Sequence, residues 1–312
     1  MLIKPPRLYS GDTIGIIAPG SPVKKTRLRR GVDYLKRIGY RIKLGENIYK
    51  QNGYLAGNDT ARVNDLHSLF CNSEVKAIIL ARGGYGALRL LNLINYKYIR
   101  ENPKILIGYS DATALQFAIL QKAELVTFSG PMAAADFGSA AVNRDAVTHL
   151  FAVLNKDNSA KYLYNYNSAQ LEVLHPGKAH GPLICGCLSV IISCIGTQYC
   201  PDFDGAILVL EDIGEEPYKL DRAITTLRHH GIFDKINGLV LGKFVNCRSS
   251  KKRDKHITIE EILLPVVKEY NIPALMNLSY GHIPEKITLP AGVMAVFDTA
   301  DKKFMLMEDA VN

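Results

Sequence analysis

KILIGYSDATALQFAIL, residues 104–120, decides the fold of the first half of the chain. Its apolar run Ile105–Gly108 has the length and composition of a buried strand, and Ala112–Lys122 has the spacing of an amphipathic helix. A strand that passes through a short turn into a helix is one unit of a parallel α/β sheet. The turn, with Ser110 and Asp111, is therefore expected at the carboxyl edge of that sheet, where open α/β folds bind ligands.

The same alternation of short apolar strands and amphipathic helices extends to both sides of this stretch. Before it, strands are expected at 13–18, 41–44 and 77–81, and helices at 24–38, 59–70 and 87–93. After residue 181, strands are expected at 206–210, 239–241, 287–289, 293–297 and 303–307, and a helix at 221–229. The pattern predicts an α/β domain over residues 1–150 with helices on both faces of a parallel sheet, a linker over 151–180, and a second domain over 181–312.

Composition narrows the function classes. The chain has 312 residues, a net charge of +8 and six cysteines, which suits a two-domain globular protein. No apolar run approaches the roughly 20 residues that span a bilayer, so no membrane partner is expected. The basic cluster at 251–255 is expected to be a solvated loop, not a nucleic-acid site, while the positive field suits a substrate with several carboxylates. The run Ile14–Ala18 is too short for a secretion signal, which favours a cytoplasmic location.

Two glycine- and serine-bearing turns are candidate sites. A serine at the position of Ser110 exposes its Oγ, and the N–H groups that follow it can stabilise an oxyanion. The alternative is that Ser110 or Asp111 only caps the helix, since the spacing is not G-x-S-x-G. In RGGYG, residues 82–86, adjacent glycines let backbone amides approach a ligand, but a tight turn explains them equally well.

Acidic residues gather after the predicted strand at 206–210. Glu211 would end that strand, and a carboxylate so placed can hold and orient an imidazole. Glu215 and Glu216 lie further on in a loop, where acids are often only solvated. Glu211 could instead pair with an arginine such as Arg222, which would leave a loop glutamate to reach a histidine.

His282 is the candidate general base, because an imidazole titrates near working pH. A single histidine in a loop is more often a surface residue, so the motif alone leaves both interpretations open. The sequence holds no H-E-x-x-H and no pair of C-x-x-C motifs, and Cys185 and Cys187 have the wrong spacing for a metal site. We therefore expect no metal and no cofactor.

Taken together, the segments resemble the LD-carboxypeptidase family of serine peptidases, the muramoyl-tetrapeptide carboxypeptidases. The resemblance covers nearly the whole chain and rests on several motifs in order: GDTIGIIAPGSP, GYLAGNDTARVNDL, ARGGYGALRLL, IGYSDATAL, TFSGPM, GCLS, LVLEDIGEEPYKLDRAITTL, LGKF and YGHIPEKITLPAG. One departure is GCLS, where the family often has a second glycine in place of Cys187. The family fold implies an N-terminal nucleotide-binding-like parallel-sheet domain, a smaller C-terminal β-rich α/β domain, and a homodimer.

The resemblance also implies roles for named residues. Ser110 would be the nucleophile, His282 the general base and Glu211 the carboxylate that orients it, with the backbone N–H groups of Gly84 and Asp111 as the oxyanion hole. We expect a carboxylate oxygen of Glu211 to bond one ring nitrogen of His282, with the other ring nitrogen facing Ser110. Because these residues come from both halves, the site would form between the domains.

Three functions compete at this point. The first is a serine carboxypeptidase that releases terminal D-Ala from a cytoplasmic muropeptide tetrapeptide during peptidoglycan recycling. The second is a self-immunity peptidase that cleaves microcin C-type aminoacyl-nucleotide amides, for which the chain offers no tryptophan but has Tyr162, Tyr164 and Tyr166. The third is a non-catalytic sugar- or nucleotide-binding module, against which the presence of all three triad candidates argues.

Overall fold

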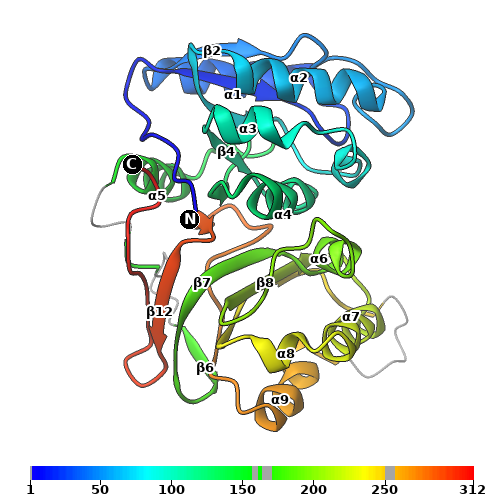
Figure 1. Cartoon of the computed structure of the whole chain (residues 1–312), viewed down its shortest axis with the longest axis vertical. Helices are drawn as coiled ribbons and strands as arrows, with labels where there is room; N and C mark the ends of the chain where they lie inside the picture. The colour runs from blue at the N-terminus through cyan, green and yellow to red at the C-terminus, as the bar shows by residue number, and fades with distance from the viewer. Residues whose placement is uncertain (1, 157–160, 164–170, 250–256) are drawn as a thin grey trace.

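The computed structural model describes residues 2–156, 161–163, 171–249 and 257–312. The chain folds into two halves, each built around one sheet, with the N-terminal half at the top of Figure 1. Residues 164, 166 and 251–255, on which we based two sequence interpretations, lie outside the described ranges. Within the described ranges, no helix combines the length and hydropathy needed to cross a lipid bilayer.

The N-terminal sheet has six strands in the order β11-β5-β4-β3-β1-β2. The strands are β1 (Thr13–Ile17), β2 (Arg41–Leu44), β3 (Val75–Leu80), β4 (Ile105–Gly108), β5 (Thr127–Ser129) and β11 (Leu289–Ala291). All neighbours pair in parallel except β11, which runs antiparallel to β5. Every residue of β1, β4 and β5 is buried, as expected for strands covered on both faces.

Helices connect these strands, three of them close to the expected ranges, whereas the helices at 96–101 and 144–154 were not expected. They are α1 (Lys25–Arg37), α2 (Asp59–Cys71), α3 (Tyr96–Glu101), α4 (Ala112–Ala123) and α5 (Arg144–Leu154). The segment expected to be helical over 87–93 forms only a short 3₁₀ helix, η1 (Ala87–Leu90). Gly86 precedes it with φ 137°, a left-handed backbone that glycine adopts readily and that ends the glycine-rich loop.

The C-terminal sheet has seven strands in the order β13-β12-β7-β8-β9-β10-β6. They are β6 (Glu172–His175), β7 (Lys178–Cys187), β8 (Ile207–Ile213), β9 (Gly238–Val245), β10 (Ala274–Met276), β12 (Met294–Asp298) and β13 (Lys303–Leu306). The central strands β7 to β10 are parallel, and β6, β12 and β13 add antiparallel edges. Its helices are α6 (Leu188–Cys194), α7 (Pro217–His229), α8 (Ile232–Lys235) and α9 (Ile259–Glu269).

The chain crosses between the two halves more than once. Strand β11 belongs by sequence to the last quarter of the chain but completes the N-terminal sheet, and β12 then returns to the C-terminal sheet. Helix α5 and strand β6 both extend into the 151–180 segment that we expected to be a linker. This crossing brings the loop before β11 against the carboxyl edge of the N-terminal sheet.

Candidate active site

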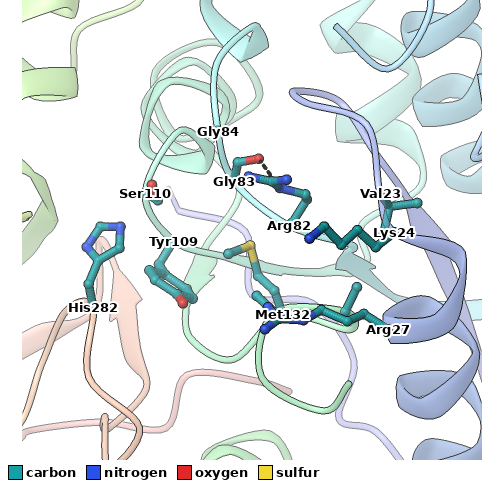
Figure 2. A pocket seen from close by; sticks show the side chains of 12 residues that line it. Val23, Lys24, Arg27, Arg82, Gly83, Gly84, Tyr109, Ser110, Met132 and His282 are labelled. Atoms are coloured by element: carbon teal, nitrogen blue, oxygen red, sulfur yellow. Dashed lines mark hydrogen bonds between the residues drawn. The ribbon is translucent and has the colours of Figure 1, made fainter. Parts of the chain in front are cut away.

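Ser110 lies on a strained turn between β4 and α4. Its φ is 66°, in the left-handed region that costs a residue with a Cβ atom roughly 1–2 kcal/mol. Non-glycine residues in that region often mark functional sites, because the surrounding structure must maintain the strain. Ser110 and His282 both line a pocket of about 450 Å³ (Figure 2). The turn therefore presents the serine to a cavity despite the absence of the G-x-S-x-G spacing.

Asp111 does not cap its own helix by a side-chain hydrogen bond. Its buried carboxylate instead accepts hydrogen bonds from the backbone N–H groups of Ala87, at 2.9 Å, and Gly86, at 3.3 Å. Burial raises the pKa of Asp111, and the two backbone hydrogen bonds partly oppose that rise. The aspartate thus fastens the end of the glycine-rich loop to the turn that carries Ser110.

Arg62 holds the same loop from the opposite side, and sequence reasoning missed it. This arginine of α2 is 1% exposed, and its Nη1 donates to the carbonyl oxygens of Gly86, at 2.9 Å, and Pro19. Its Nη2 pairs with Asp59. The available signal was its spacing, since Arg62 lies four residues before Leu66 on the apolar face expected for the helix at 59–70. An arginine on such a face is rarely buried without a partner.

The glycine-rich loop packs directly against Ser110. A Cβ atom at Gly83 would lie 2.9 Å from the Cβ of Ser110 and 3.0 Å from its Oγ, so only glycine fits there without displacing the serine. That same Cβ position is 3.5 Å from the backbone nitrogen of Asp111, and Gly84 lines the pocket with Ser110. The two backbone groups that the resemblance implies as oxyanion donors therefore lie on the two segments that meet at Ser110.

Glu211 contacts His282 as expected. Its Oε2 lies 2.7 Å from Nδ1 of His282, and the carboxylate is buried near the end of β8. Burial raises the pKa of Glu211, and the hydrogen bond to His282 opposes that rise. Gly281 makes the approach possible, because a Cβ atom on it would lie 2.6 Å from Oε2 of Glu211.

The alternative acids have other surroundings. Glu215 pairs with Lys219 at 3.3 Å, and the guanidinium of Arg222 lies over the ring of Tyr218. The predicted contact between Glu211 and a ring nitrogen of His282 is therefore confirmed, and the alternative pairing of Glu211 with Arg222 is not what the structure contains. Strand β8 continues to Ile213, so Glu211 lies within the strand and not directly after it as we expected. The sequence could still make the distinction, because a strand fixes a side chain more firmly than a loop does.

His282 is also supported through Tyr109. The two rings meet edge to face with centroids 5.1 Å apart and an interplanar angle of 73°. Nζ of Lys286 lies 4.6 Å from the Tyr109 ring centroid and pairs with Asp136. Burial raises the pKa of Tyr109 well above its usual value, so the ring stays neutral. No local sequence pattern predicted this cluster, since Tyr109 and Lys286 are 177 residues apart in the chain.

A further hydrogen bond joins the histidine loop to the N-terminal sheet. The Tyr280 hydroxyl lies 2.8 Å from Oγ of Ser129, which ends β5. Both residues are buried, so the bond is shielded from water. It fixes the C-terminal loop bearing His282 against the sheet edge from which Ser110 projects.

The remaining candidate groups do not form a second reaction centre. No group of three or more possible metal ligands occurs within the described ranges. Burial raises the pKa of the Cys185 thiol to about 12, which disfavours a reactive thiolate. Cys187 of GCLS is also buried and donates to Oδ1 of Asp212 at 3.3 Å, so the departure from glycine is accommodated by packing.

Two family profiles match the chain. The LD-carboxypeptidase N-terminal domain matches residues 14–130, and the LD-carboxypeptidase C-terminal domain matches residues 180–297. The boundaries of these matches correspond broadly to the two sheets described above. Strand β11 lies within the second match although it pairs into the first sheet.

Individual relatives are similar over nearly their full length. A Bacillus subtilis protein named "Probable murein peptide carboxypeptidase" is 38% identical over 96% of this chain and 92% of its own. The Escherichia coli "Microcin C7 self-immunity protein MccF" is 30% identical over 96% of this chain and 94% of its own. A crystal structure of muramoyltetrapeptide carboxypeptidase from Oxalobacter formigenes matches with a TM-score of 0.81 and 29% identity, covering 94% of this chain and 97% of the other.

Proposed function

The chain belongs to the LD-carboxypeptidase family, and from this premise we propose that it removes the terminal D-Ala from a muropeptide tetrapeptide by serine catalysis. The bond hydrolysed would be the amide between the L-centre of the diamino acid and D-Ala. The observation that carries the proposal is the 2.7 Å contact between Glu211 and His282, beside a pocket that His282 shares with the strained Ser110.

The proposed chemistry begins with proton transfer. Nε2 of His282 accepts the Oγ proton of Ser110 while Oγ attacks the carbonyl carbon of the amide. Glu211 holds Nδ1–H of the ring, which fixes the tautomer and stabilises the imidazolium that forms. The imidazolium then gives its proton to the nitrogen of the departing D-Ala, leaving an ester on Ser110. Water, activated by the same histidine, hydrolyses that ester and regenerates the serine.

Stabilisation of the oxyanion is assigned to two backbone N–H groups, those of Gly84 and Asp111. Backbone donors need no reorganisation at the moment of reaction, provided that the segments bearing them are rigid. Support for rigidity comes from the carboxylate of Asp111 and the guanidinium of Arg62, which both bind Gly86 at the end of the loop. The oxyanion would form between the nucleophile turn and the loop.

The direct test is incubation of the purified protein with a tetrapeptide muropeptide, followed by mass spectrometry. The expected product has lost one alanine residue, and free alanine appears in equal amount. The Ser110→Ala variant provides the blank. Intact substrate after prolonged incubation with the wild-type protein would contradict the proposal.

A second candidate function is self-immunity of the microcin C type, which the similarity to the Escherichia coli protein over nearly the whole chain favours. In that case the same triad would hydrolyse an amide of an aminoacyl nucleotide. Parallel assays with a microcin C-type aminoacyl nucleotide and with the muropeptide would separate the two, by the ratio of kcat/KM. We expect the muropeptide to be the better substrate, in line with the 38% identical relative.

The proposal also covers the cellular location and the oligomeric state of the protein. A recycled muropeptide is an intracellular substrate, so we propose that the protein acts in the cytoplasm. We also propose a homodimer, as in the sequence-based expectation. Sedimentation equilibrium would test the second point, with twice the 34.5 kDa chain mass expected.

A further inference from the structure

The pocket beside Ser110 carries three positively charged side chains and no carboxylate among the residues that line it. Lys24 and Arg27 come from the start of α1, and Arg82 begins the glycine-rich loop. Figure 2 shows Ser110 and His282 on one side of the pocket, Lys24 and Arg27 on the other, and Arg82 between them. The cavity is therefore electrostatically one-sided, with its positive charge opposite the proposed triad.

These charges are not neutralised by neighbouring acids. Within the described part of the chain, none of the three forms an ion pair, whereas the nearby Arg62, Arg89 and Lys286 each pair with an aspartate. Like charges that share a cavity destabilise the folded protein unless a counter-charge arrives. A ligand that brings negative charge would supply it.

The position of Lys24 and Arg27 also opposes the usual preference of a helix. The N-terminus of an α-helix carries partial positive charge and favours acidic side chains, yet the first turn of the 13-residue α1 has no acidic residue. Lys24 occupies its N-cap without a side-chain capping bond. Lys24 and Arg27 therefore do not stabilise the helix through its dipole. Because both line the pocket beside Ser110, their position points to a role in binding an anion.

Arg82 is held so that part of its guanidinium stays available. Its Nε donates to the carbonyl oxygen of Gly83 at 3.2 Å, and Nη1 lies 3.4 Å from that of Pro22. Nη2 makes no hydrogen bond to any residue that the structure describes. Because these contacts already restrict the side chain, Arg82 loses little further conformational entropy when it binds a carboxylate. Its planar guanidinium matches the geometry of that anion.

We propose that Arg82, Lys24 and Arg27 form a carboxylate-binding wall that recognises the peptide substrate. This inference rests on the proposed function, because it assumes a peptide cleaved at Ser110. Arg82 takes the terminal carboxylate of the departing residue. One residue spans at most about 3.6 Å, so that carboxylate must lie close to the scissile bond, and Arg82 is the cation adjacent to the loop that contacts Ser110. Lys24 and Arg27 take a second carboxylate, further from the bond.

A cycle of enzyme and substrate changes tests the assignment of Arg82. The substrates are the tetrapeptide and its C-terminal carboxamide, and the enzymes are wild type, Arg82→Gln and Arg82→Lys. Wild type should prefer the acid by roughly tenfold or more in kcat/KM, since a hydrogen bond to a charged group contributes about 1.5–3 kcal/mol. Arg82→Gln should lose that preference, with little change on the amide, and Arg82→Lys should retain part of it.

Lys24 and Arg27 are tested with two tetrapeptides that differ only in the carboxylate on the side chain of the diamino acid. The Lys24→Gln/Arg27→Gln double variant should lose roughly tenfold on the peptide that has this carboxylate and little on the other. Arg30→Gln is the matched control, since Arg30 lies on α1 outside the pocket lining. Its kinetics should equal those of wild type on both peptides.

The outcomes separate the two proposals. If wild type cleaves none of the peptides, the proposed function fails. If wild type cleaves the acid and the amide equally well, or if Arg82→Gln slows both by the same factor, the proposed function stands and the binding wall is overturned. Retention of the acid preference by Arg82→Lys, with its loss in Arg82→Gln, would support recognition by charge.

Discussion

Ser110–Asp111 and Glu211–Asp212 are similar pairs in the two halves of the molecule. In each pair a proposed catalytic residue is followed by a buried aspartate whose carboxylate accepts two backbone N–H groups. The difference lies in what the aspartate holds. Asp111 reaches across to Gly86 and Ala87 of another loop, whereas Asp212 binds its own neighbour Ile213 and Ser189 at the start of α6.

This difference shows that the two halves position their groups by different means. Glu211 lies within strand β8, so the ladder with β7 fixes its backbone. Ser110 has a left-handed φ of 66° and lies outside any ladder, so side chains must hold the segments around it. The N-terminal half therefore depends on buried charged groups to arrange backbone donors, while the C-terminal half depends on the sheet for Glu211 and on side-chain contacts around His282.

Removal of the proposed nucleophile should have the largest effect. Ser110→Ala is expected to lower kcat by about 10⁴-fold or more, because the variant has no Oγ to attack the carbonyl carbon and to carry the ester intermediate. The circular dichroism spectrum should be unchanged. If the variant kept a tenth of wild-type activity with an intact fold, Ser110 would not be the nucleophile.

Glu211→Gln should have the next largest effect. The amide cannot stabilise the imidazolium and can present a donor to Nδ1, so we expect kcat to fall by about 10³-fold or more. Glu215→Gln is the matched control, because Glu215 pairs with Lys219 and not with His282. Equal losses in the two variants would show that the contact of Glu211 with His282 is not what determines kcat.

The aspartate pair gives the sharpest test of the contrast between the halves. In Asp111→Asn, the side-chain NH₂ group would face one of the two backbone N–H groups that now donate to the carboxylate, those of Gly86 and Ala87. Two donors cannot bond each other, so the loop carrying Gly84 should become more mobile. We expect kcat to fall by roughly 10–100-fold with KM nearly unchanged, as for imperfect placement of an oxyanion donor. Asp212→Asn should lower thermal stability yet leave kcat within about threefold of wild type. Comparable losses of kcat in Asp111→Asn and Asp212→Asn would show that the two aspartates do not differ in the way proposed.

The smallest expected effect is a pH dependence of the free energy of unfolding. It should depend on the contact between α5 and the segment before β11. His149 of α5 is buried, and its Nδ1 accepts the backbone N–H of Thr288, just before β11, at 3.1 Å. Burial lowers the pKa of His149 from 6.5 to about 4. The folded state therefore keeps the neutral ring, and the unfolded chain takes up the proton first as the pH falls below 6.5. Stability should be lost between pH 6.5 and about 4.

The expected loss can be measured by urea unfolding at pH 7 and pH 5. Wild type should lose about 2 kcal/mol more than His149→Gln between these two values, since the variant has no such titration. A thermal or chemical transition with the same pH dependence in both proteins would show that this histidine does not resist protonation in the folded state.

Local patterns predicted most of the N-terminal half. Strand β4 and helix α4 lie where the apolar run and the helical spacing of residues 104–122 put them. The contact of Glu211 with His282 followed from the strand end and the family resemblance. The strand and the helix follow from local side-chain patterns, whereas the contact of Glu211 with His282 joins residues 71 apart and needed the resemblance to be predicted.

Contacts between distant segments could not be predicted in the same way. Arg62 binds a carbonyl 24 residues further on, and Tyr280 bonds Ser129 across 151 residues. The first contact depends on how α2 packs beside the glycine-rich loop, and the second on the return of the chain to the N-terminal sheet at β11. Neither arrangement is encoded by a periodicity. The shortened helix at Ala87–Leu90 has the same origin, because Gly86 and the carboxylate of Asp111 set the backbone there.

We propose that His282 and Glu211 of the C-terminal half activate Ser110 of the N-terminal half. Covalent labelling of Ser110 tests this most directly. The protein is treated with a serine-directed phosphonylating reagent, the modified peptide is identified by mass spectrometry, and the rate is compared between wild type and His282→Gln. We predict one adduct per chain, on Ser110, formed at least about 100-fold more slowly in the variant. An adduct on another residue, or an unchanged rate in His282→Gln, would contradict the account.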